Sequence, residues 1–172
     1  MIERGRAIAT AYNGVVLRDA LRTALAGLAA ALAWLLGIQL VFGPAQAVLA
    51  DPARQSAKFL AAFSQEPLPR MAEMPWALPA GLVVIGMIFA GVYSWLEPKL
   101  RGPAWRKGLT FGVVAWALMT PWFEFYLPWN VMREPLALVL IECACWLGVM
   151  VPVGLAIALT YRAASPRAAR SV

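Results

Sequence analysis

The chain has 172 residues, of which 62% are hydrophobic and 14% are charged, whereas soluble domains are about 45–50% apolar and about 25% charged. A single water-soluble globule of this size does not bury so much apolar surface, so the composition excludes that class and predicts a membrane protein. The net charge of +6 does not indicate nucleic-acid binding, because the basic residues flank apolar runs instead of gathering on one polar element.

The predicted fold is all-α: a polytopic membrane protein with four transmembrane helices, forming a single membrane domain over residues 1–172. A transmembrane helix needs about 20 apolar residues to cross about 30 Å of hydrocarbon. Residues 1–22 are expected to form a cytoplasmic lead-in, which the spacing of Ile8, Tyr12, Val15 and Val16 predicts to be helical. Residues 23–42 are the expected first span. The run Ala45-Gln46-Ala47 resembles a signal-peptide cleavage site, but the apolar core before it is too long, so we expect no cleavage.

Residues 43–75 are expected to form a segment outside the membrane. Within it, Asp51-Pro52 has the sequence of a helix N-cap followed by proline at the first helical position. Ala53, Ala57, Leu60 and Phe63 then recur at helical spacing among polar residues. The pattern predicts a short amphipathic helix, about residues 52–64, that lies on the outer membrane surface.

The other three spans are expected at residues 76–96, 108–129 and 136–161. A basic cytoplasmic loop at 97–107 separates the second span from the third, and residues 162–172 form a cytoplasmic tail. With this threading, eleven of the fifteen Lys and Arg residues lie on the side of the two termini, and four lie on the opposite side. The positive-inside rule then places both termini in the cytoplasm, and the expected location is the cell inner membrane.

Small residues at four-residue spacing predict where helices pack closely. In lipid no hydrophobic effect draws helices together, so small side chains contribute by letting two backbones approach. The expected packing positions are Gly86, Ala90 and Ser94 on the second span, Gly108 and Gly112 on the third, and Ala144 and Gly148 on the fourth. These faces are expected to pack within the bundle or against another subunit.

The loop between the second and third spans carries Lys99, Arg101, Arg106 and Lys107. Cations beside a transmembrane helix on the cytoplasmic side attract anionic lipid headgroups, so these four residues are expected lipid contacts. The same loop interleaves tryptophan with arginine, which leaves contact with a cytoplasmic partner as an alternative.

Two carboxylates, Glu124 and Glu142, lie inside apolar spans and are the candidate proton or cation site. The uncharged run 108–123 is about 24 Å long as a helix, so Glu124 is expected about one turn below the outer interface. Glu142 lies about 200° around the helix from Ala144. If the face of Ala144 packs inward, Glu142 points outward and reaches for the interface. The alternative for both carboxylates is an interfacial side chain without a mechanism.

No catalytic motif occurs in the sequence. It has no Gly-rich phosphate loop, no HExxH pair and no nucleophile elbow. The chain also contains no histidine, which excludes histidine-ligated metal and haem. Cys143 and Cys145 point about 200° apart on a helix, so they neither bridge nor chelate, and they are expected as small buried hydrophobes. We expect no metal, no cofactor and no enzymatic activity.

The stretch from residue 91 to 121 contains Gly91, Tyr93, Pro98, Arg101-Gly102, Lys107-Gly108, Phe111-Gly112 and Trp116. In these residues it resembles small uncharacterised bacterial four-helix membrane proteins. The resemblance covers under a fifth of the chain. It implies an inner-membrane helical bundle and carries no known chemistry or site residues.

Three functions are compatible with the sequence. The expected one is a non-enzymatic accessory, assembly or scaffold subunit of a larger inner-membrane complex, with lipids and other membrane subunits, or further copies of the chain, as partners. The first alternative is a small proton- or cation-coupled transporter or channel subunit that uses the intramembrane carboxylates. The second alternative is a lipid- or pigment-binding module.

Overall fold

The computed structural model describes the backbone of residues 2–164 and the side chains of residues 14, 16–70 and 72–164. Most of the expected tail, from residue 165 onward, and the side chains of residues 1–13 lie outside the described part. Within that part the predicted all-α class is confirmed, because every regular element is a helix.

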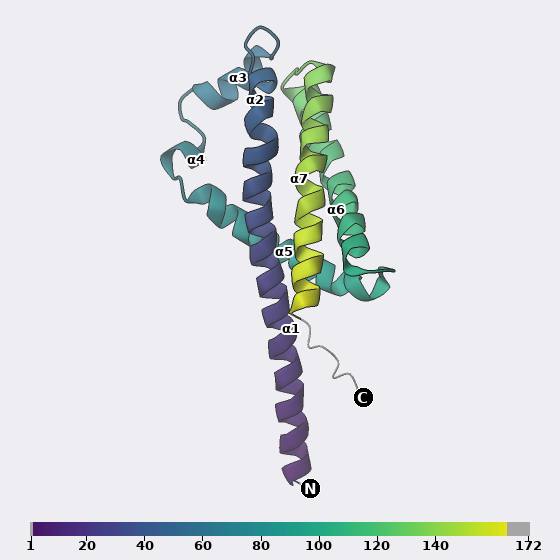
Figure 1. Ribbon diagram of the computed structural model, residues 1–172. Helices are drawn as coiled ribbons and strands as arrows, with labels where there is room; N and C mark the ends of the chain where they lie inside the picture. Colours follow the sequence, from purple (N-terminus) through teal and green to yellow (C-terminus); the bar gives the residue numbers. More distant parts are fainter. Residues whose placement is uncertain (1, 165–172) are drawn as a thin grey trace.

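One long helical rod opens the chain (Figure 1). It starts as α1 (Ile2–Gly37), widens into the π-helical segment η1 (Ile38–Phe42) and continues as α2 (Gly43–Leu49). Two short helices, α3 (Ala57–Ser64) and α4 (Arg70–Glu73), lead to α5 (Ala77–Leu96). A 3₁₀ turn, η2 (Glu97–Lys99), precedes α6 (Ala104–Thr120), which runs into the π-helix η3 (Pro121–Val131); α7 (Leu136–Ala163) is the last element.

Three helical runs in the described residues are long and apolar enough to cross a membrane: Val16–Leu49, Ala77–Lys99 and Leu136–Ala163. The chain is therefore a multi-pass helical membrane protein. The run from α6 into η3, which is the expected third span, is not among the three. Pro121, Glu124 and Pro128 fall in its second half and lower its hydropathy.

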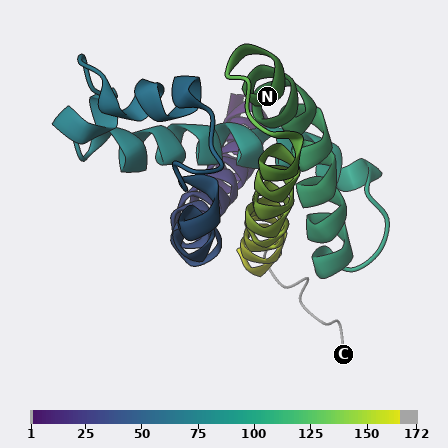
Figure 2. The same ribbon diagram turned by 90° about the horizontal axis from the view of Figure 1, so that it is seen from above.

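The long helices lie side by side in the order α5, α1, α7, α6. The rod of α1 packs against both α5 and α7, and α6 packs against α7. Figure 2 shows α5 crossing obliquely, so that its first residues splay away from α1 toward α3 and α4. We call the end with η3 and the start of α7 the upper end, and the end with the α5–α6 connection the lower end (Figure 1).

Glycines set the two closest helix contacts. A Cβ added to Gly86 on α5 would stand 2.4 Å from the carbonyl oxygen of Gly27 on α1. A Cβ added to Gly112 on α6 would stand 2.6 Å from the carbonyl oxygen of Met150 on α7. Backbones this close need glycine. Of the other expected packing residues, Ala90 and Gly108 are buried, and Ser94 is half-buried and donates to the Gly91 carbonyl at 2.7 Å.

The face expected to pack on the last span does not pack within the bundle. Ala144 is exposed, and a Cβ on Gly148 would only reach ordinary contact with Val41, at 3.6 Å. The close contact on α7 is made by Gly154, where a Cβ would stand 2.4 Å from the carbonyl oxygen of Gly108. Gly154 lies about 240° around the helix from Gly148. Gly154 and the buried Ala158 also have four-residue spacing, which is the signal that identifies this face.

The amphipathic helix begins later than expected. Ser56, not Asp51, is its N-cap: the Ser56 hydroxyl accepts a hydrogen bond from the Phe59 amide at 3.1 Å. Asp51 instead caps a turn, because its side chain accepts from the Ala53 amide and its carbonyl from the Gln55 amide. The buried side chain of Gln55 holds this turn against the upper end of the bundle.

Candidate functional site

Glu124 lies on the π-helix η3, at the upper end of the bundle. Pro121 and Pro128 supply no backbone N–H, so this stretch cannot complete a regular α-helical ladder, and π-helical turns occur often at functional sites. Glu124 is half-buried. It borders a cavity of about 40 Å³, enough for a water molecule, where α1, α6–η3 and α7 meet; the other lining residues are Trp34, Met119, Thr120, Phe123, Trp146 and Met150.

Trp146 is the aromatic centre of this region. Its ring stands 4.9 Å from that of Phe42 and 6.4 Å from that of Trp34, between ring centroids. Its indole N–H lies beside the Glu124 carboxylate, yet it is buried and outside hydrogen-bonding geometry with any described residue. The cavity therefore has a carboxylate and an unsatisfied donor in its wall, the two kinds of group that an ordered water would bridge.

Two further contacts fasten this region to α7. The Trp116 indole N–H on α6 donates to the Cys143 carbonyl at 2.9 Å, and the Cys143 thiol donates to the Glu124 carbonyl at 3.6 Å. Cys143 is buried, Cys145 is half-buried, and both are free thiols. The described residues contain no group of three or more His, Cys, Asp and Glu side chains that could hold a metal ion.

Glu142 on α7 does not point fully outward. It is half-buried and close enough to Glu124 and Glu134 to interact with both electrostatically. The expectation that it faces away from the bundle depended on Ala144 packing inward. Because Ala144 is exposed instead, the rotation of α7 brings Glu142 toward η3.

Glu134 is a further candidate residue, which the sequence pattern did not indicate. It sits between η3 and α7, is 3% exposed, and its Oε2 accepts a hydrogen bond from the Gln55 amide at 2.9 Å. The side-chain amide of Gln55 also donates to the Leu49 backbone carbonyl at 2.9 Å, and its side-chain oxygen accepts from the Ser56 backbone amide at 2.7 Å. The other Glu134 oxygen, Oε1, is buried without a partner. The only signal in the sequence is a lone acid beside a proline, just before an apolar span.

The carboxylates Glu124, Glu134 and Glu142 thus gather at the upper end without a cationic partner in the described part of the chain. The ion pairs among the described residues are Arg22–Asp19, Arg54–Asp51 and Lys107–Glu97, and none of them involves these three carboxylates. Poorly hydrated carboxylates without an ion-pair partner are candidate proton-binding groups.

The four expected lipid-contact residues lie at the lower end and behave differently from one another. Arg101 and Arg106 are exposed. Lys99 holds its ammonium 3.9 Å from the ring centroid of Trp95. Lys107 is half-buried in the first turn of α6, where it pairs with the carboxylate of Glu97 and donates to the Glu97 carbonyl at 3.1 Å. The expected loop 97–107 is therefore partly helical.

Glu134 should make stability depend on pH. Burial raises the pKa of its carboxyl above the ordinary 4.5, and the hydrogen bond from Gln55 only partly opposes this. The folded protein thus binds the Glu134 proton more tightly than the unfolded chain does. The stabilisation that this gives to the folded state is complete below pH 4.5 and is lost as the pH rises through the folded pKa. Glu134→Gln should remove that loss.

The measurement is the thermal midpoint of the purified protein in detergent, for wild type and Glu134→Gln, from about pH 4 to about pH 8. The thermal midpoint of the variant should increase relative to that of the wild type as the pH rises. Glu66→Gln, at an exposed position, is the matched control and should follow the wild type. Parallel curves for wild type and Glu134→Gln would show that the folded protein does not raise this pKa.

Comparison of the chain with protein-family models, with curated proteins and with solved structures found no match.

Proposed function

We propose that this multi-pass membrane protein is a non-enzymatic accessory, assembly or scaffold subunit of a larger inner-membrane complex. The observation that carries the proposal is the row of helices α5, α1, α7, α6, in which α5 and α6 each pack mainly against one neighbour. Only 22% of the most apolar stretch of Ala77–Lys99 is buried within the protein. An open row encloses no transport path of its own and leaves broad faces for lipid or for other subunits.

The same proposal includes four membrane crossings with both termini in the cytoplasm. The run α6–η3 supports this because it lies along α7 for most of its length (Figure 1). A segment packed antiparallel along a spanning helix crosses the same membrane. The Lys and Arg residues then fall eleven to four on the two sides, in agreement with the positive-inside rule.

Photo-crosslinking in the native membrane tests the subunit role. A crosslinking amino acid is placed at Ile88 on α5 or at Leu118 on α6, whose side chains are 56% and 78% exposed. Val153, which is 0% exposed, is the matched buried control. We expect a discrete partner band from Ile88 or Leu118 and none from Val153, and stoichiometric copurification of that partner after gentle extraction. A chain that crosslinks to no protein and purifies alone contradicts the proposal.

A second candidate function follows from the carboxylates at the upper end: proton or cation coupling through Glu124 and Glu142. Their half-burial, their proximity and the lack of a cationic partner among the described residues favour it. The row of helices opposes it, because further subunits would have to complete any path.

Glutamine substitutions separate the two functions. Glu124→Gln and Glu142→Gln keep the shape and hydrogen-bonding capacity of each side chain and remove the charge. We expect both variants to leave proteoliposome proton and cation flux, and partner recovery, unchanged. Abolished pH- or ion-dependent flux would instead establish the second function, and non-additive effects in the double variant would show that the two carboxylates share a proton.

A further inference from the structure

A cavity of about 450 Å³ opens at the lower end of the bundle, where α1, α5, α6 and α7 come together. We call it the basic cavity. It is lined by the cationic side chains of Arg22, Lys107 and Arg162, by Glu97, by the tyrosines Tyr93 and Tyr161, by Ala158, and by the start of α6 at Gly102, Pro103 and Ala104. Asp19 pairs with Arg22 from beside the cavity, so three cations face two carboxylates and the cavity keeps a net charge of +1.

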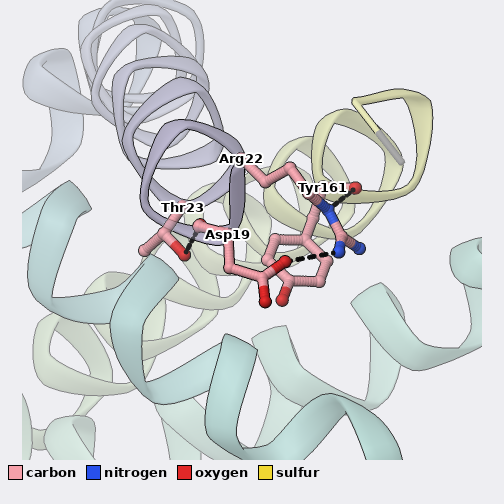
Figure 3. Close-up of polar contacts among 4 residues, drawn as sticks. All are labelled: Asp19, Arg22, Thr23 and Tyr161. Carbon is pink, nitrogen blue, oxygen red and sulfur yellow. Dashed lines mark hydrogen bonds and ion pairs between the residues drawn. The ribbon is translucent and has the colours of Figure 1, made fainter. Parts of the chain in front are cut away.

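Arg22 is fixed at one wall of the basic cavity. Figure 3 shows it reaching from α1 to Tyr161 on α7. It donates to the Asp19 carboxylate at 3.0 Å and to the Tyr161 carbonyl at 3.4 Å, and its guanidinium carbon stands 4.1 Å from the centre of the Tyr161 ring. On the other side Glu97 orients the Lys107 ammonium. The cations are therefore preorganised instead of being free on the surface.

Neutral donors complete the lining. Tyr93 is 1% exposed, and its hydroxyl has no hydrogen-bond partner among the described residues, although its ring packs against Phe111 and Tyr161. The Ala104 amide, at the first position of α6, likewise has no backbone acceptor in the described part. A hydroxyl that lines the cavity beside three cations, at the positive end of a helix, is suited to an anionic ligand.

An apolar groove of about 730 Å³ lies beside the basic cavity, between α1 and α5. The two share Tyr161 as a wall, and the Asp19–Arg22 ion pair joins them, because Asp19 lines the groove and Arg22 the cavity. The rest of the groove is mainly Val16, Ala20, Ala24, Met87 and Trp95, with the hydroxyls of Thr23 and Ser94. A ligand that fills both has an anionic head and an apolar chain.

We propose that the basic cavity and the adjoining groove bind one anionic membrane phospholipid, its phosphate among Arg22, Lys107, Arg162 and the Tyr93 hydroxyl, and an acyl chain along the groove. A free phosphate compound shares the headgroup chemistry but leaves the groove unexplained. Exposed tryptophans at the same end, Trp95 and Trp105, are typical of the membrane interface, where such headgroups lie. The proposal rests on the proposed orientation with this end at the cytoplasmic face, and not on the subunit role.

The test uses the purified full chain in a neutral detergent, with native mass spectrometry to count bound lipid and thermal unfolding to follow its effect. The probes are phosphatidylglycerol, phosphatidylcholine and inorganic phosphate. Only phosphatidylglycerol should remain bound at one molecule per chain and raise the midpoint. Equal binding of phosphatidylcholine overturns the anionic site. Protection by inorganic phosphate equal to that by phosphatidylglycerol overturns the lipid as ligand and assigns the cavity to a soluble phosphate compound.

Variants locate the site. Tyr93→Phe combined with Arg162→Gln removes a hydroxyl and an exposed cation while the aromatic packing stays, and should weaken phosphatidylglycerol binding about tenfold or more. Arg162→Lys, which keeps the charge, should restore part of the loss. The control, Arg101→Gln with Arg106→Gln, removes two exposed cations at the same end outside the cavity lining and should stay within about twofold of wild type. An equal loss of phosphatidylglycerol binding in both double variants would indicate diffuse electrostatic attraction to the surface and would contradict the proposal. None of these measurements needs a partner protein, so a failed partner search leaves the result intact.

Discussion

Replacing Gly154 with alanine should separate α6 from α7 and lower the free energy of unfolding by about 1–3 kcal/mol, the usual cost of overpacking a tight core. The added Cβ would stand 2.4 Å from the Gly108 carbonyl oxygen and 2.6 Å from the Gly112 amide nitrogen. Both neighbours are backbone atoms, which cannot rotate away as a side chain would. Gly112→Leu should cost at least as much, because its larger side chain meets the backbone of Met150 and Val151.

The measurement is the free energy of unfolding in mixed micelles as a denaturing detergent is titrated. Gly91→Ala on α5 is the matched control, because a Cβ there has nothing within 4 Å, and it should be neutral or slightly stabilising. If Gly154→Ala has the same free energy of unfolding as Gly91→Ala, the close α6–α7 contact is contradicted.

Gln55→Leu should be the most damaging substitution outside the helices, with a loss of about 3 kcal/mol, in the range for leaving a buried charged group unpaired. Gln55 is 8% exposed and donates to both Leu49 and Glu134, while Ser56 bonds to the Met132 carbonyl at 2.6 Å. These bonds tie the turn after α2 to the connection between η3 and α7. Leucine fills the volume but leaves the carboxylate and a carbonyl without their donors.

A double-mutant cycle distinguishes this network from simple packing. Combined with Glu134→Gln, which is neutral, Gln55→Leu should cost less than it does in the wild type, because no buried charge is left unpaired. The same unfolding titration supplies the four free energies. Additive costs would show that Gln55 and Glu134 contribute independently and that their hydrogen bond does not couple the two connections.

Hydropathy and residue spacing in the sequence sufficed for the all-α class and for the presence of long apolar helices. They also gave the bounds of α5 and α7 to within two residues, because a long apolar run defines each of these helices. The π-helical segments η1 and η3 were not predicted, because Pro121 and Pro128 show only that the α-helical ladder is interrupted and not which hydrogen-bond spacing replaces it. The helical spacing of Ile8, Tyr12, Val15 and Val16 also predicted a helix ahead of the first span, and α1 does begin at Ile2.

For the candidate sites the limit is rotation about the helix axis. Glu124 and Glu142 stand out in a sequence because they interrupt apolar runs, but whether they face each other depends on which side of α7 packs inward. Glu134 and Gln55 lie in separate polar connections 79 residues apart, and only the folded chain brings them together. The basic cavity likewise joins Arg22 and Tyr161, which are 139 residues apart.

Four membrane crossings with both termini in the cytoplasm are the central claim. Labelling of single cysteines in intact cells by a membrane-impermeant maleimide tests it most directly, in a background with Cys143 and Cys145 changed to serine. Cysteines at Glu66 and Arg133, both exposed, should be labelled from outside, and cysteines at Gly102 and Arg162 should react only after the membrane is opened. External labelling at Gly102, or protection at Arg133 in cells labelled at Glu66, would contradict the four-span account.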